Sequence, residues 1–168
     1  SHFYLDLAKQ GLRMPIGTDL VLHEEAHPAS ARHDATLLGR VVERTARRYH
    51  TPLALPLMDL SLEKADLLSS LGIAANQIDH FHFTAPPSTE TVEQVLASGD
   101  RPFPEPSVAS QGAVRYIAEQ TDLMPIGMLI GPFSLMTKLV ADPITPVAMA
   151  GSGLTAEEIR NMMNSAQE

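Results

Sequence analysis

The chain has 168 residues, of which 20 are acidic and 12 are basic, and it contains neither Cys nor Trp. The lack of Cys excludes disulfides, thiolate zinc sites and cysteine nucleophiles within this chain, while a net charge of -8 argues against a nucleic-acid partner, because phosphate binding needs Lys and Arg. With 44% hydrophobic and 19% charged residues, the chain has the composition of a globular protein, and we expect a single α/β unit over residues 1–168.

The first quarter of the sequence predicts a strand and a long helix. A Pro/Gly turn at residues 14–17 leads into a β-rich run at 18–22, and the polar stretch 23–30, which contains a proline, is typical of a loop. From residue 31 to 49, apolar residues recur at helical spacing with arginines largely on the other side, which predicts an amphipathic helix.

The next segment predicts two strands around a helix. Residues 52–59 are almost wholly apolar, which is typical of a strand buried on both faces of a parallel sheet, although Pro56 cannot donate a ladder hydrogen bond. Residues 60–71 predict a helix that Gly72 ends. Residues 78–83 alternate between polar and apolar side chains as a strand does.

The remaining predicted elements are a capped helix at 88–97, a proline-rich surface connector at 101–106, a helix at 108–122, a buried strand at 125–131, a helix near 134–140 and a helix that begins at 154. The longest uncharged apolar stretch, 123–137, is shorter than the roughly 20 residues that a membrane span needs. The first residues have no basic region followed by an apolar run, so no signal peptide is predicted and we expect a cytoplasmic protein without membrane contact.

About four strands that alternate with helices indicate a parallel sheet with right-handed crossovers. Two architectures satisfy this pattern: an open doubly wound sheet, and part of a (β/α)8 TIM barrel. A complete barrel needs about 250 residues, so this chain could form only about half of one. The periodicity of the sequence does not choose between them.

Two positions could carry chemistry. Asp59 is the first charge after an apolar run, at the predicted carboxyl end of a buried strand, where parallel folds hold their ligands; it could equally cap the next helix. Residues 130–139 form the second candidate, because a strand that runs through Gly131 and Pro132 into a helix leaves backbone N–H groups pointing at the same crevice. A tight strand-to-helix turn explains this pattern as well.

Seven histidines raise the question of a metal. His80 and His82 lie two residues apart on a predicted strand, and His23 and His27 flank two glutamates. Neither pair has the spacing of a specific ligand motif, so we predict no metal site in this chain.

Several segments together resemble the uroporphyrinogen decarboxylase superfamily, which includes the corrinoid-dependent cobalamin:thiol methyltransferases. The run 57–65 followed by Leu71-Gly72 is similar to the family's strand that ends in Asp and continues into a helix and a Leu-Gly. Residues 130–137 are similar to its strand and Gly-Pro-Phe/Trp-Thr-Leu turn, and residues 103–106 resemble its proline-rich connector. The resemblance covers the chain from about residue 14 onward.

This resemblance implies a (β/α)8 barrel of which the chain is the N-terminal half. It also implies that Asp59 is the catalytic residue, because the matching aspartate of the decarboxylases binds pyrrole N–H groups and stabilises the protonated intermediate as carbon dioxide leaves. Charge-assisted hydrogen bonds of this kind are worth about 1.5–3 kcal/mol each. The resemblance further places substrate or cofactor contacts at the residues Asp19, His23, Gly131, Phe133, Ser134 and Lys138.

Two departures favour the methyltransferase-like branch. The decarboxylases carry an Arg-Gln-Ala-Gly-Arg segment that grips substrate carboxylates, whereas residues 18–23 here contain no arginine, so an anionic tetrapyrrole would meet Asp19, Glu24 and Glu25. Lys138 replaces the family's tyrosine. We therefore expect methyl transfer from a corrinoid to a thiol, with a tetrapyrrole decarboxylase and a non-catalytic binding module as alternatives.

The resemblance also bears on cofactors and partners. In the methyltransferases, zinc is held by a His and two Cys of the C-terminal half, and this chain has no Cys. The chain alone is therefore expected to bind no zinc, and a corrinoid or tetrapyrrole is its expected ligand. Half a barrel leaves both edge strands unpaired, so we expect a homo-oligomer or pairing with the remainder of the barrel.

Overall fold

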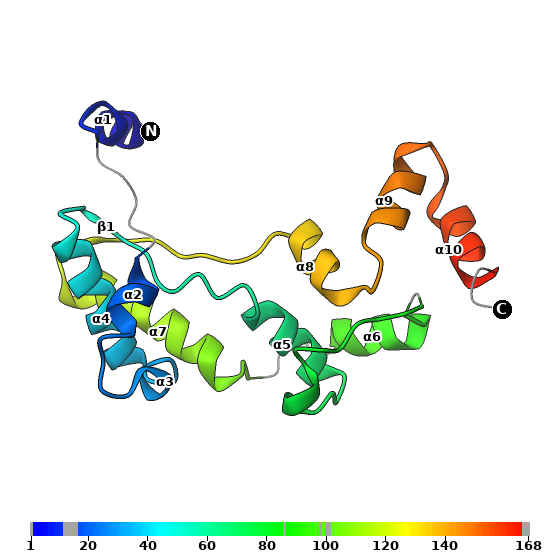
Figure 1. The fold of residues 1–168 in the computed structure, drawn as a ribbon, viewed down its shortest axis with the longest axis horizontal. Helices are drawn as coiled ribbons and strands as arrows, with labels where there is room; N and C mark the ends of the chain where they lie inside the picture. Colours follow the sequence, from blue (N-terminus) through cyan, green and yellow to red (C-terminus); the bar gives the residue numbers. More distant parts are fainter. Residues whose placement is uncertain (1, 12–16, 86, 98, 100–101, 166–168) are drawn as a thin grey trace. The chain divides into compact units, whose positions relative to one another are not determined.

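The structure is a computed structural model that describes residues 2–11, 17–85, 87–97, 99 and 102–165 (Figure 1). The chain divides into two compact units: unit 1 consists of Ser1–Asp59 and Phe103–Leu129, and unit 2 of Leu60–Pro102 and Ile130–Glu168. Unit 1 contains α1 (His2–Lys9), α2 (Thr18–Leu22), α3 (Pro28–Ala31), α4 (Ala35–Arg48), β1 (Leu53–Ala54), α7 (Glu105–Gln120) and β2 (Met124–Pro125). Unit 2 contains α5 (Leu62–Ser70), the 3₁₀-helix η1 (Ala75–Gln77), α6 (Thr89–Ala97), α8 (Pro132–Leu139), α9 (Ile144–Gly151) and α10 (Ala156–Ser165).

The expected amphipathic helix is confirmed as α4. Asp34 caps it, because its side chain accepts hydrogen bonds from the backbone N–H groups of Thr36 and Leu37, both at 2.8 Å. Its buried residues are Leu38, Gly39, Val41, Val42, Thr45 and Ala46. The helix ends where His50 takes a left-handed conformation with a φ of 51° and the N–H of Thr51 bonds to the carbonyl of Ala46 at 3.1 Å.

The core of unit 1 lies where α4 packs on α7 and β1. Two hydrophobic clusters form it: Val21, Leu22, Ala31, Leu38, Val41, Leu57 and Ala113 in one, and Val42, Ala46, Ala54 and Ile117 in the other. Two glycines allow the helices to approach closely. A Cβ atom on Gly39 would lie 2.6 Å from the ring of Tyr116, and one on Gly112 would lie 2.4 Å from the Cβ of Ala35.

Two of the expected strands are present in part and pair in parallel. β1 lies within the predicted run 52–59, whereas β2 shares only Pro125 with the predicted strand 125–131, whose other residues form no strand. β1 lies beside β2 with Leu53 opposite Met124 and Ala54 opposite Pro125. The N–H of Met124 bonds to the carbonyl of Pro52 at 2.7 Å, and that of Ile126 to the carbonyl of Ala54 at 2.9 Å. The ladder is shorter than predicted, and on the β1 side Pro56 has no N–H to donate where the strand would continue. The described residues thus form a mostly helical protein with a two-stranded parallel sheet, and they form no barrel.

The prediction of a strand at residues 18–22 is wrong, because this run is the helix α2. A five-residue run with three apolar side chains fits either element by pattern alone, and tertiary packing decides. Val21 and Leu22, adjacent in sequence, are both fully buried in the core of unit 1. The hydroxyl of the buried Thr18 donates to the carbonyl of Leu55 at 2.9 Å, which ties α2 to the segment that follows β1.

The predicted strand at residues 78–83 is also wrong. Turns follow η1 here, and Phe83 alone forms an isolated parallel bridge, to Val140. The alternation is better explained by an aromatic contact, since the rings of Phe81 and Phe83 meet edge to face with centroids 5.1 Å apart.

Smaller corrections concern the connections. The predicted loop 23–30 ends in the short helix α3, whose proline lies in its first turn. The predicted connector 101–106 ends in the first turn of α7, where Pro106 is tolerated because backbone N–H groups at a helix start have no partner within the helix. The predicted turn at 14–17 falls on residues 14–16, which lie outside the described part of the chain. The helices α1 and α9 had no counterpart in the sequence prediction.

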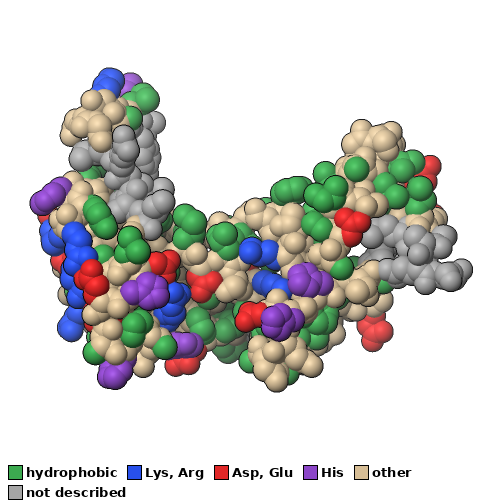
Figure 2. Space-filling view, in the orientation of Figure 1, with side chains coloured by type: hydrophobic (Ala, Val, Ile, Leu, Met, Phe, Trp, Pro, Cys, Tyr) green, Lys and Arg blue, Asp and Glu red, His purple; other side chains and the backbone are tan. Residues whose placement is uncertain are grey.

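Unit 2 confirms the helices that were expected at its start. Gly72 ends α5 with a φ of 77°, and the N–H of Thr91 in α6 bonds to the Ser88 hydroxyl at 3.1 Å. Its later helices bury little: Phe133 is 61% exposed and Ile144 is 73% exposed. Hydrophobic side chains accordingly lie at the surface around α8 and α9 (Figure 2). No helix among the described residues is long and apolar enough to cross a membrane.

Candidate functional site

Asp59 follows the most deeply buried extended segment of the molecule. Every residue from Leu53 to Leu57 is buried, and Asp59 comes two residues later, at the point where unit 1 ends. It does not cap α5, because that helix begins at Leu62 and its N-cap residue is Ser61. Asp59 is therefore not the N-cap residue of α5, and one of its partners comes from another segment of unit 1.

That partner is Arg32, at the carboxyl end of α3. Its Nη1 atom lies 3.8 Å from Oδ2 of Asp59, and its Nη2 atom donates to Oδ1 of Asp19 at 2.8 Å. The side chains are partly buried, with 35% of Arg32, 45% of Asp19 and 29% of Asp59 exposed. We call these residues the Asp19–Arg32–Asp59 cluster. It brings together two of the residues that the sequence singled out, and it carries one negative charge in excess.

The fold of unit 1 holds the cluster from three directions. Asp19 follows Thr18, whose hydroxyl bonds to Leu55, so α2 is fixed to the extended segment that leads to Asp59. Arg32 follows Ala31, which is 2% exposed and belongs to the core cluster that also contains Leu57. Each member of the cluster is thus one or two residues away from a buried anchor. Because the anchors pack on one another, the three charged groups keep their mutual distances.

Sequence analysis missed Arg32 altogether. It lies 13 residues from Asp19 and 27 from Asp59 and belongs to no motif. Nothing local marks it, because it follows a four-residue helix in a stretch that was predicted to be the start of a longer one. The structure thus places a guanidinium group beside Asp19, which the sequence did not indicate, and what an anionic ligand would meet there stays a prediction.

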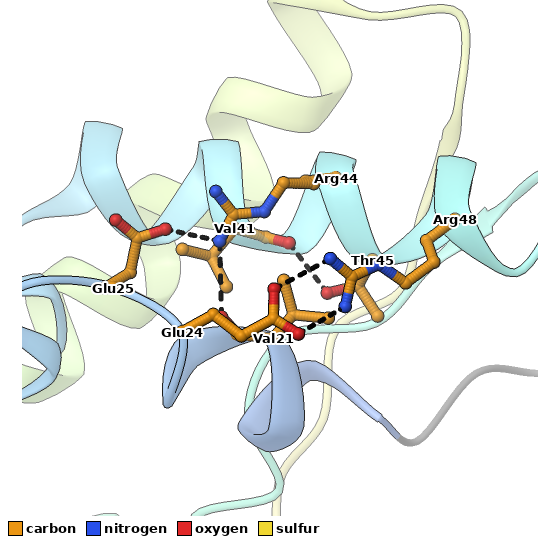
Figure 3. A network of polar contacts seen from close by, with 7 residues as sticks. All are labelled: Val21, Glu24, Glu25, Val41, Arg44, Thr45 and Arg48. Atoms are coloured by element: carbon orange, nitrogen blue, oxygen red, sulfur yellow. Dashed lines mark hydrogen bonds and ion pairs between the residues drawn. The ribbon is translucent and has the colours of Figure 1, made fainter.

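The acidic residues that follow α2 are also neutralised by arginines. Arg48 contacts both carboxylate oxygens of Glu24, at 2.6 and 2.7 Å, and Arg44 forms an ion pair with Glu25 and bonds to the carbonyl of Val21 (Figure 3). The hydrogen bond from Arg48 lowers the pKa of Glu24, and the pKa of Arg48 is raised in return. Basic and acidic side chains accordingly lie side by side over α4 (Figure 2). Both glutamates are thus part of the fold rather than of a ligand site.

His23, one of the histidines that the sequence singled out, is the exposed residue at the end of α2. The ring of His82 interacts with the carbonyl of His80 at 3.0 Å. In the described part of the chain, no group of three or more His, Asp and Glu side chains could hold a metal ion.

The second candidate segment forms the expected turn into a helix, within unit 2. Gly131 is the N-cap residue of α8, followed by Pro132, Phe133 and Ser134 in its first turn, all exposed. Lys138 is half-buried in the last turn of this helix. Since Asp59 belongs to unit 1, the expected closeness of Asp59 to this turn stays a prediction.

Glu63 binds the backbone directly before this turn, and the sequence did not predict this contact. It lies in the first turn of α5, and its Oε1 atom accepts a hydrogen bond from the N–H of Ile130 at 3.0 Å. Its Oε2 atom is buried and has no hydrogen-bond partner among the described residues. The bond fixes the backbone directly before Gly131, so Glu63 determines where α8 begins relative to α5.

Unit 2 also contains an apolar cavity of about 430 Å³. Side chains of α5, α6 and α8 line it together with Phe83 and Val140. Among the described lining residues Thr91 alone has a polar side chain, and its hydroxyl already bonds to that of Ser88 at 2.9 Å. A cavity of this size and lining suits an uncharged apolar group.

Comparisons with protein-family models, with curated proteins and with solved structures found no match to this chain. The functional interpretation therefore rests on the sequence motifs and on the geometry described above.

Proposed function

We propose that this chain is part of a (β/α)8-barrel enzyme similar to the uroporphyrinogen decarboxylase superfamily, of the corrinoid-dependent, methyltransferase-like kind. The observation that carries the proposal is the parallel pairing of Leu53–Ala54 with Met124–Pro125. The helices α5, α6 and α7 and the 3₁₀-helix η1 separate these strands in the sequence. Parallel neighbours joined through helices are the unit from which such barrels are built.

The position of Asp59 supports the same proposal. In parallel sheets, ligands bind beyond the carboxyl ends of the strands, and Asp59 follows the carboxyl end of the apolar run that contains β1. A carboxylate held at such a place accepts hydrogen bonds from N–H groups of a ligand. We propose this role for Asp59, with Asp19 and Arg32 beside it.

The charge of the cluster favours a corrinoid over a carboxylated tetrapyrrole. Two carboxylates and one guanidinium group leave one negative charge in excess, and Arg32 already contacts both carboxylates. A ligand with many carboxylates would be repelled, whereas the peripheral amides of a corrinoid offer N–H donors. Decarboxylation of an anionic tetrapyrrole is accordingly the weaker alternative.

Zinc chemistry is not assigned to this chain. The resembling methyltransferases hold zinc with a His and two Cys, and the sequence contains no Cys. No cluster of three or more His, Asp and Glu residues in the described segments replaces that set. The residues present do not fit the metal, so activation of a thiol by zinc is no part of the role proposed for these residues.

The cavity in unit 2 favours a second candidate, a module that binds an apolar group without chemistry. Its lining offers no charged side chain among the described residues, so an occupant would be held by apolar contact alone. Catalysis would then play no part, and Asp59 would have no influence on binding. This difference separates the two candidates.

Binding measurements on the purified chain test the proposal. Methylcobalamin is titrated into wild-type protein, the Asp59→Asn variant and, as a matched control that removes one negative charge at an exposed site, Asp79→Asn. Loss of one charge-assisted hydrogen bond predicts a Kd at least about 10-fold higher for Asp59→Asn, and an unchanged Kd for Asp79→Asn. Equal affinity of all three proteins, or tighter binding of uroporphyrin than of methylcobalamin, would contradict it.

We also propose that the chain associates, with a second copy or with the remainder of a barrel. Both hydrophobic core clusters lie in unit 1, while α8 in unit 2 has no buried residue and the side chains of α9 whose burial is described are exposed or half-buried. Exposed apolar surface of this kind is typical of interfaces. Light scattering coupled to size exclusion is the test, and a monomer of 18.2 kDa that binds no apolar dye would contradict the proposal.

A further inference from the structure

We propose that Arg32 is a positioning residue, which holds the Asp59 carboxylate in the orientation that receives the ligand. The inference about ligand binding rests on the function proposed above. The inference about Asp59 itself rests on unit 1 alone.

The geometry of the guanidinium group carries the inference. Its two terminal nitrogens point to different carboxylates, with the close contact to Asp19 at 2.8 Å and the longer one to Asp59 at 3.8 Å. The short bond fixes the guanidinium group, and the fixed group then presents its other nitrogen to Asp59. Arg32 therefore links Asp19, which belongs to α2, to Asp59, which is the proposed ligand-binding residue.

Asp19, on one side of Arg32, is anchored to the core of unit 1. Asp19 is in α2, which the Thr18 hydroxyl ties to Leu55 and which buries Val21 in the core. Asp59, on the other side of Arg32, is accessible, because 29% of its side chain is exposed. A ligand can thus reach Asp59 while Arg32 restricts its rotation from the protein side.

Arginine suits this role and lysine does not. The guanidinium group is planar and carries its N–H donors in a fixed fork, so it can contact two carboxylates at once. A lysine ammonium is a single point charge on a flexible stem. Arg32→Lys keeps the charge of the cluster and is expected to lose the contact to one of the two aspartates.

The first arm of the test is a binding cycle with methylcobalamin. The proteins are wild type, Arg32→Gln, Asp59→Asn, the double variant and, as a matched control, Arg115→Gln, which changes an exposed arginine of α7. Outer-shell partners that orient metal ligands contribute 10- to 100-fold in metal affinity, and by analogy we expect Arg32→Gln to raise the Kd about 10-fold. In the Asp59→Asn background, Arg32→Gln should not change the Kd further. Arg115→Gln should leave the Kd unchanged both in wild type and in the Asp59→Asn variant.

The second arm needs no ligand. The guanidinium N–H signals of Arg32 are recorded by ¹H–¹⁵N NMR in wild type, Asp59→Asn and Asp79→Asn. A positioning contact predicts that the Arg32 signals shift in Asp59→Asn and stay in place in Asp79→Asn. Circular dichroism verifies folding, and Arg32→Lys replaces Arg32→Gln if the latter does not fold, with the same expected loss of affinity.

The outcomes separate the two proposals. The positioning role would be overturned if Arg32→Gln raised the Kd equally in wild type and in Asp59→Asn. It would also be overturned if the NMR signals of Arg32 did not shift in Asp59→Asn. If wild type does not bind methylcobalamin, the proposed function fails, and the NMR arm alone decides whether Arg32 holds Asp59.

Discussion

The close approach of α4 and α7 makes a quantitative prediction, because it depends on two glycines. A methyl group added at Gly39 would lie 2.6 Å from Cδ1 and Cγ of Tyr116, and one added at Gly112 would lie 2.4 Å from the Cβ of Ala35. Carbon atoms in contact normally stay about 3.5–4.0 Å apart. Each substitution by alanine therefore requires the helices or the ring to move by about 1 Å.

The two sites differ in how they can relax. At Gly39, rotation of the Tyr116 ring can relieve part of the clash, although its hydroxyl donates to Glu43 at 3.1 Å, but the Cβ of Tyr116, at 2.8 Å from the added methyl, also requires a backbone shift. At Gly112, Ala35 has no rotatable side chain and only a backbone shift can remove the clash. Overpacking costs about 1–3 kcal/mol, and alanine in a helix returns up to about 1 kcal/mol relative to glycine. We expect a net loss of about 1 kcal/mol for Gly39→Ala and about 2 kcal/mol for Gly112→Ala.

Urea denaturation followed by far-UV circular dichroism measures these losses as lower midpoints at an unchanged m-value. Gly127→Ala is the matched control, because nothing lies within 4 Å of its added Cβ atom, and it should change the free energy of unfolding by less than about 0.5 kcal/mol. In addition, Tyr116→Ala should cost less in the Gly39→Ala background than in wild type. Midpoints for Gly39→Ala and Gly112→Ala that equal that of Gly127→Ala would refute this account of the helix contact.

Three further predictions concern unit 1. Asp34→Ala removes the cap of α4 and should lower the free energy of unfolding by about 1 kcal/mol in the same denaturation assay, whereas Asp34→Ser should retain most of it. Thr18→Val leaves the buried carbonyl of Leu55 without its donor and should cost about 1–3 kcal/mol; a neutral result would contradict the anchoring of α2. The pKa of Glu24 is lowered below its ordinary value of 4.5 by the hydrogen bond from Arg48, so its contribution to stability is present above that value and is lost as the pH falls through the lowered pKa. Thermal melting of Glu24→Gln should therefore vary less with pH in this acid range than that of wild type, and parallel curves would count against the ion pair.

Elements that depend on local signals could be predicted from the sequence. The apolar spacing of α4 is set by neighbours three and four residues apart, Gly72 ends α5 through its own backbone conformation, and Ser88 caps α6 from the position directly before it. These interactions form within a single segment, so the sequence contains all the information that they need. The parallel relation of the runs around Leu53 and Met124 followed from the same reasoning, since helices separate the two runs.

The tertiary structure alone decided the identity of short apolar runs. Residues 18–22 satisfy their backbone groups equally well as strand or helix, and the core that receives Val21 and Leu22 selects the helix. Pro56 then limits the continuation of β1, because its missing N–H donor ends a ladder that no third strand supports among the described residues.

The candidate site divides in the same way. Asp59 could be found from the sequence, because a charge after a buried run marks the end of a strand. Arg32 could not, since it meets Asp59 across 27 residues of chain and only the packing of α2, α3 and the extended segment brings them together. The local sequence pattern therefore determined helices such as α4, α5 and α6 and the position of Asp59. The path of the chain through the core determined that Arg32 lies beside Asp59.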